Sequence, residues 1–111
     1  MTDLTETTLR SIGITRNYRG YQYLYDAAQL VADDPSCLCD VARKIYTVLA
    51  ERYDTTWSSV ERNIRTCIRR AWTLNPALIQ QMAGYQLDAM PTTSQFIEIL
   101  STYLQRKAKQ Q

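Results

Sequence analysis

Apolar residues recur every three or four positions along most of this chain, and this spacing constrains the fold more than any other feature. It is typical of helices that bury one face. Only three glycines and three prolines interrupt the 111 residues, so long regular elements are expected. A chain of this length can bury one hydrophobic core without disulfides or metals. We therefore predict an all-α fold, a single compact domain of about six helices over residues 1–111.

The predicted helices lie between recognisable start and stop signals. They are expected at residues 4–12, about 18–33, 38–53, 57–73, 76–83 and about 93–105. The second ends before Pro35, because proline disfavours helical geometry in the residue before it. Pro76 can open the fifth, and Thr92 with Gln95 has capping-box spacing at the start of the sixth. Residues 106–111 are expected to form a polar tail that frays.

Composition argues against several classes of protein. No stretch approaches the roughly 18 consecutive apolar residues of a membrane span, and the first nine residues do not resemble a secretory signal. Cys37, Cys39 and Cys67, without any histidine, do not supply four zinc ligands. We expect buried, reduced thiols in a cytoplasmic protein. The sequence offers no recognisable nucleophile–base pair, metal cluster or glycine-rich phosphate loop, so we expect no enzyme, metal or cofactor.

Two neighbouring predicted helices, at 38–53 and 57–73, are joined by a polar turn of about three residues. This is the outline of a helix-turn-helix. Either Thr56 or Ser58 can cap the second helix, and Ser58 with Glu61 has capping-box spacing. The second helix has two distinct faces. One face carries Val60, Ile64, Cys67 and Ala71, and the other carries Ser58, Arg62, Arg65 and Arg69.

The outer face of this helix has the chemistry of a DNA-reading surface. Four arginines against one glutamate give the helix a net charge of +3. An arginine fork matches the acceptors of guanine, and Glu61 can accept from the cytosine amine. Hydroxyl groups and the free N–H groups at the helix start suit phosphate oxygens. The alternative is an ordinary solvated face on which Glu61 pairs with Arg65, four residues later.

A longer pattern of residues resembles a known family. It includes Ile12-Gly13-Ile14, Arg19-Gly20-Tyr21, the run from Tyr53 to Arg65, Ala71-Trp72, Gly84-Tyr85 and Phe96-Ile97. Over residues 12–107 the chain resembles the C-terminal effector domains of the sporulation-initiation response regulators (stage zero A transcription factors) of endospore-forming Firmicutes. The resemblance implies a six-helix domain that reads a short promoter box and regulates transcription at the onset of sporulation. It also implies head-to-tail pairs on adjacent boxes, and contact with the transcription machinery is expected.

The resemblance places Glu61 and Arg62 at base-contacting positions, Arg65 at the DNA surface and Ser58 among phosphate contacts. Together with the charge pattern, it leads us to expect the following DNA contacts at the bound site. Bases are contacted by Glu61, Arg62 and Arg65, and phosphates by Thr56, Ser58, Ser59, Thr66 and Arg69.

Three positions depart from the family pattern. Ser59 stands where the family usually has a base-reading arginine, which puts the target box in doubt. Thr66 replaces a histidine. Trp57 replaces a small residue, and we expect it to cover the core rather than touch the DNA backbone, because tryptophan is mostly buried on average.

The family's regulators carry an N-terminal receiver domain, whereas here a start of the form Met1-Thr2-Asp3-Leu4 precedes the matching region. We expect a stand-alone effector rather than an excised one. The alternative function is a helical interaction module that pairs with a full-length regulator and has lost specific DNA reading.

Overall fold

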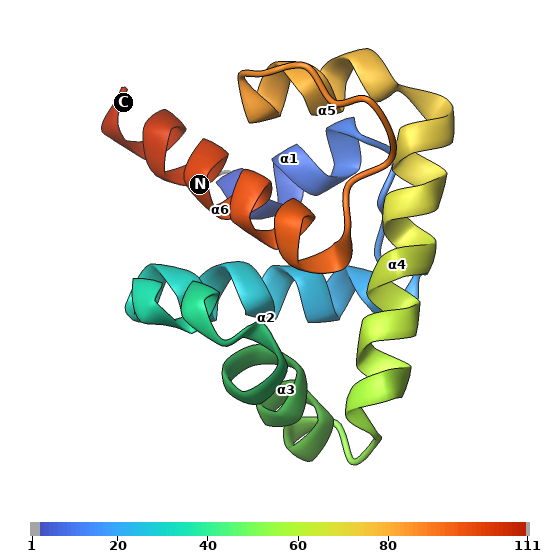
Figure 1. Ribbon diagram of the computed structural model, residues 1–111, viewed down its shortest axis with the longest axis vertical. Helices are drawn as coiled ribbons and strands as arrows, with labels where there is room; N and C mark the ends of the chain where they lie inside the picture. Colours follow the sequence, from blue (N-terminus) through green and yellow to red (C-terminus); the bar gives the residue numbers. More distant parts are fainter. Residues whose placement is uncertain (1–2, 111) are drawn as a thin grey trace.

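Six α-helices account for most of residues 3–110, the part of the chain that the computed structural model describes, and no strand occurs there (Figure 1). The all-α prediction is therefore confirmed. The helices are α1 (Leu4–Ser11), α2 (Arg19–Asp33), α3 (Thr47–Arg52), α4 (Trp57–Leu74), α5 (Pro76–Ala83) and α6 (Thr93–Lys109). A short 3₁₀ helix, η1 (Pro35–Cys39), and a π-helical turn, η2 (Ala42–Tyr46), lie between α2 and α3.

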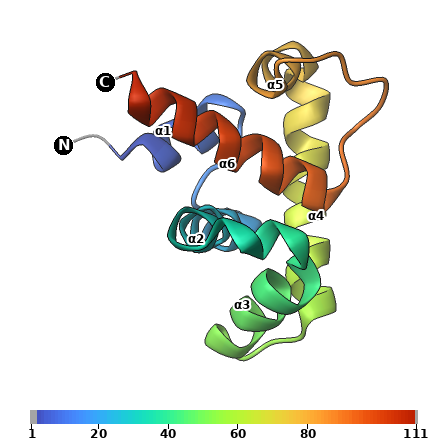
Figure 2. The ribbon, with the colours of Figure 1, turned by 60° about the vertical axis from the view of Figure 1, so that its left-hand side comes forward.

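Helix α2 crosses the middle of the domain and packs against most of the others. In Figure 1, α1 and α6 lie on one side of α2, α3 lies on the other, and α4 runs along its end. Figure 2 shows the same separation after rotation. The core takes fully buried side chains from nearly every helix, including Leu9, Leu24, Leu49, Ile64, Ile79 and Phe96. None of the described helices is long and apolar enough to cross a membrane.

Helices α2 and α4 come into close contact at Gly20. A Cβ atom on this glycine would lie 2.4 Å from the carbonyl oxygen of Asn63 and 2.5 Å from Sγ of Cys67. Only glycine leaves room for this crossing. Burial raises the pKa of the Cys67 thiol to about 11, so the thiol stays protonated inside this contact at neutral pH.

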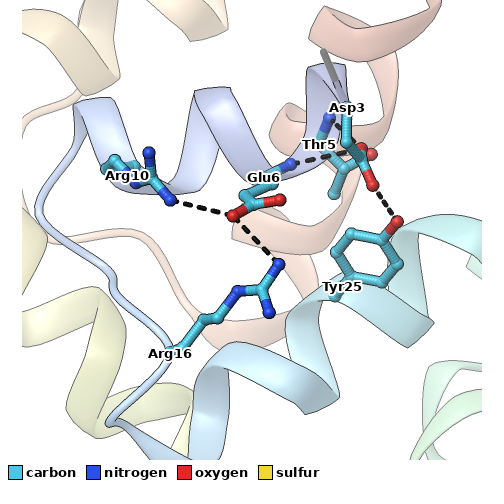
Figure 3. A network of polar contacts seen from close by, with 6 residues as sticks. All are labelled: Asp3, Thr5, Glu6, Arg10, Arg16 and Tyr25. Atoms are coloured by element: carbon cyan, nitrogen blue, oxygen red, sulfur yellow. Dashed lines mark hydrogen bonds and ion pairs between the residues drawn. The ribbon is translucent and has the colours of Figure 1, made fainter. Parts of the chain in front are cut away.

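A polar network fastens α1 to α2 (Figure 3). Asp3 caps α1 through the amides of its first turn and also accepts a hydrogen bond from the hydroxyl of Tyr25 on α2. That bond lowers the pKa of Asp3 and raises the pKa of Tyr25 to about 12. Glu6 lies 2.8 Å from the guanidinium of Arg10 and 3.0 Å from that of Arg16. The hydrogen bond from Tyr25 and the ion pair with Arg16, which lies in the connection to α2, thus hold the N-terminal helix together with its buried Leu9.

The predicted helix at 38–53 is wrong at its start. Pro35 opens a 3₁₀ helix whose first amide is capped by Asp34, with 3.1 Å between Ser36 N and Oδ1. The chain leaves helical geometry at Asp40, whose side chain accepts from the amide of Arg43 at 3.3 Å and restarts the helix. Asp40 is therefore a second capping residue inside the segment. Cys39 is exposed, contrary to the expectation of three buried thiols, whereas Cys37 and Cys67 are buried.

The last helix extends further than predicted, to Lys109 rather than to about residue 105. Helix α6 continues through Arg106, whose guanidinium donates to the carbonyl oxygen of Met82 at 2.6 Å. That carbonyl lies in the last turn of α5, just before Gly84, which takes a positive φ of 80° to end the helix. Arg106 satisfies one of the carbonyls that a helix end leaves unpaired.

Candidate nucleic-acid interface

The turn between α3 and α4 is tight and well hydrogen-bonded. The amide of Thr55 donates to the carbonyl of Ala50 at 2.8 Å, and Asp54 takes a positive φ of 52°, which aspartate tolerates better than most residues. Thr56 then caps α4 by accepting from the amide of Ser59 at 3.1 Å. Ser58 lies inside the helix, so the predicted capping box between Ser58 and Glu61 is wrong.

A carboxylate on α2 fixes the end of α3 just before this turn. Oδ2 of Asp26 accepts from the guanidinium of Arg52 at 3.2 Å and from the hydroxyl of Tyr53, while Oδ1 accepts from Gln22 at 3.0 Å. The ring of Tyr53 also packs edge-on against Tyr23, with 5.4 Å between centroids. Burial and the bond to Asp26 raise the pKa of Tyr53 to about 12. The scaffold helix α2 therefore holds both helices of the helix-turn-helix, α4 at Gly20 and α3 at Asp26.

The two predicted faces of α4 are present. The inward face, made of Val60, Ile64, Cys67, Ile68 and Ala71, is at most 1% exposed. The outward stripe consists of Ser58, Arg62, Arg65 and Arg69, and all four residues are exposed. Helix α4 forms the right-hand edge of the molecule in Figure 1, whereas in Figure 2 the loop between α5 and α6 reaches beyond it. The exposure of all four residues leaves the stripe accessible to a duplex.

Glu61 and Arg65 form an ion pair on the outward side of α4. Their closest atoms are 3.5 Å apart, and the side chains are 21% and 47% exposed. This is the contact that the solvated-face interpretation anticipated. An exposed pair of this kind contributes at most about 1 kcal/mol. It can therefore be exchanged for contacts to bases or phosphates at little cost.

The hydroxyl groups predicted to bind phosphate differ in what they can still offer. A phosphate oxygen accepts hydrogen bonds, so a hydroxyl must have its proton free. Thr66 donates to the carbonyl of Arg62 at 3.0 Å, which occupies its proton. Ser59 accepts from the side chain of Asn63 at 3.4 Å. Thr56 accepts from the amide of Ser59 and lies 3.2 Å from Oγ of Ser58, and either of these two hydroxyls can donate to the other. The geometry thus favours Ser59 and one hydroxyl of the Thr56–Ser58 pair as phosphate donors over Thr66.

Two side chains near the turn differ from the sequence expectation. Trp57 was expected to cover the core, but 55% of it is exposed. Apolar spacing over residues 38–53 also predicts Tyr53 on the inward face of its helix, but Tyr53 is 38% exposed and its hydroxyl donates to Asp26. Asp26 itself was missed, because its partners follow it by 26 and 27 positions and no local spacing reveals them.

Two packed helices, a tight turn and an outward arginine stripe on the second helix define a helix-turn-helix DNA-binding domain. The family model described as the sporulation initiation factor Spo0A C terminal matches residues 5–104. The chain belongs to this family, and the resemblance noted in the sequence is confirmed. Its members are DNA-binding effector domains that activate transcription; they bind sites called 0A boxes and are not enzymes.

Proposed function

We propose that this domain binds a specific duplex sequence in promoters and regulates transcription at the onset of sporulation. Helix α4 enters the major groove with its N-terminal half foremost. Glu61, Arg62 and Arg65 contact base edges, while Thr56, Ser58, Ser59 and Arg69 contact phosphates. Thr66 contributes only if its bond to the Arg62 carbonyl opens. The domain acts in the cytoplasm, on the nucleoid.

The observation that carries this proposal is the outward stripe of α4. Its arginines are exposed, whereas the opposite face of the same helix is completely buried. Arg62 has no ionic partner among the described residues, so its fork is available for the paired acceptors of a guanine. The first turn of α4 supplies backbone N–H groups and hydroxyls beside it, which suit the flanking phosphates.

A second candidate is an interaction module that shares the fold but no longer reads DNA specifically. The Glu61–Arg65 ion pair favours it, because both side chains already have a partner. Ser59 favours it as well, since a serine cannot span the distance that an arginine covers. Such a module would pair with a full-length regulator through a protein surface.

The two candidates are separated by binding measurements on duplexes with a 0A box and with the same bases scrambled. We expect a clear preference for the box and a steep loss of affinity as salt rises, because each neutralised phosphate releases counterions. Equal affinity for both duplexes would contradict specific reading. A lack of binding to either duplex at low salt would support the interaction module.

Self-association is a further part of the proposal. Two domains are expected to bind head to tail on adjacent boxes, and their outer surfaces to contact the transcription machinery. Stoichiometry on duplexes with one box and with two boxes in tandem measures the first expectation. Independent binding to the two boxes would contradict it.

A further inference from the structure

Trp57 is an exposed tryptophan beside the proposed reading surface. It is 55% exposed, as much as any large apolar side chain that the structure describes. Exposing more than half of so large a side chain to water is costly, and tryptophan at a surface is a frequent binding residue. The role in the core that its average burial suggests is therefore not the one it has here.

Trp57 lies at the N-terminal end of α4. It is the first residue of the helix, and side chains in a helix tilt toward its N-terminus. The ring therefore projects beyond the end of the helix, beside the α3–α4 turn. That turn is the lowest point of the ribbon in both Figure 1 and Figure 2.

The neighbours of Trp57 belong to the proposed contact surface. Residues four apart lie on the same side of a helix, so Trp57 lies one turn before Glu61. Consecutive helical residues are about 100° apart, so Trp57 lies outside the row made by Ser58, Arg62 and Arg69, on the side of Glu61. It is accessible because it opens the helix, and a side chain at the leading end of a helix that enters the groove lies beside the wall of the groove.

We propose that Trp57 packs against the sugar–phosphate backbone of bound duplex DNA. The indole face covers a deoxyribose. The indole Nε1–H, which can only donate, donates a hydrogen bond to a phosphate oxygen. This inference rests on the DNA binding proposed above but not on specific reading, because a backbone contact carries no sequence information. It adds a contact that the charge pattern does not include, since indole is neutral.

The neutral indole gives the contact a distinctive signature. Trp57→Ala is expected to lower affinity for boxed and scrambled DNA alike, by about tenfold for one hydrogen bond with its packing. The slope of affinity against salt should stay unchanged, since no charge is removed. Trp57→Phe keeps the ring and loses the donor, so its loss should be smaller, about threefold.

Two variants provide the controls. Tyr85→Ala removes another exposed aromatic, 49% exposed, which follows the far end of α5, and it should leave affinity unchanged. Arg69→Ala should lower both the affinity and the salt slope, the latter by about one unit. Urea denaturation of each variant verifies that the domain remains folded.

A direct signal complements the affinities. The chain has two tryptophans, so Trp72→Phe leaves Trp57 as the only one. The emission of Trp57 should shift when either duplex is added. Adding Tyr85→Ala to this variant should leave the size of that shift unchanged.

Unchanged affinity in Trp57→Ala would overturn the contact, and a loss confined to boxed DNA would overturn its assignment to the backbone. Wild-type protein that binds both duplexes equally would contradict specific reading while leaving this contact supported, whereas wild-type protein that binds neither would overturn both.

Discussion

The two faces of α4 differ in what surrounds their side chains. The inward face is covered by α2 at Gly20 and by the rest of the core, and its side chains are almost completely buried. Among the described residues, the side chains of the outward stripe make the loose Glu61–Arg65 ion pair and a hydroxyl contact between Ser58 and Thr56. Substitutions on the inward side should therefore change stability, and those on the outward side should change binding. A single helix can evolve new binding preferences because its two faces are energetically separate.

The largest expected effect tests the inward side. Gly20→Ala places a methyl group 2.4 Å from a backbone oxygen of α4, and backbone cannot move aside as a flexible side chain can. We expect a loss of about 3 kcal/mol in the free energy of unfolding, because the two helices must separate. Urea denaturation measures it. The control is Arg19→Ala, an exposed neighbour on the same helix, which should change the free energy of unfolding by less than about 0.5 kcal/mol. A change as small as this in Gly20→Ala would show that α2 and α4 pack less closely than described.

A pair of outward substitutions should leave stability intact and separate two kinds of contact. Arg62→Ala is expected to reduce discrimination between boxed and scrambled DNA by about 1–3 kcal/mol, because a bidentate base contact is lost. Arg69→Ala should weaken binding to both duplexes equally and reduce the salt slope. Binding isotherms at several salt concentrations measure both. If both variants bound as wild type does, the outward stripe would not be the reading surface.

The smallest effect uses pH to probe the inward side alone. The pKa of the Cys67 thiol is raised by burial from its ordinary value of 9.0 to about 11, whereas the thiol of the unfolded chain keeps the ordinary value. Above that value the unfolded state loses its proton before the native state does, so stability falls as pH rises toward 11. The stability advantage of wild type over Cys67→Ala should shrink by about 1 kcal/mol between pH 8 and pH 10. Denaturation curves at the two pH values measure this, and a constant difference would indicate that the thiol is not buried.

Local pattern predicted much of this molecule. Apolar spacing located all six helices and both faces of α4, because burial of one face is what the spacing reflects. The apolar spacing did not predict the contacts of side chains at the ends of helices. Asp40 restarts the third helical segment, and Trp57 extends past the end of α4 instead of folding back on the core. The contact of Asp26 with Arg52 and Tyr53 joins residues distant in sequence, so it could be found only in three dimensions.

The bond from Arg106 to the carbonyl of Met82 has a practical consequence for protein engineering. It makes the last turns of α6 part of the packing of α5. A fusion partner or affinity tag that replaces residues from 106 onward would remove this brace. A linker attached after Lys109 would preserve it, and would also leave the opposite end of the domain, where α4 begins, clear of the added polypeptide.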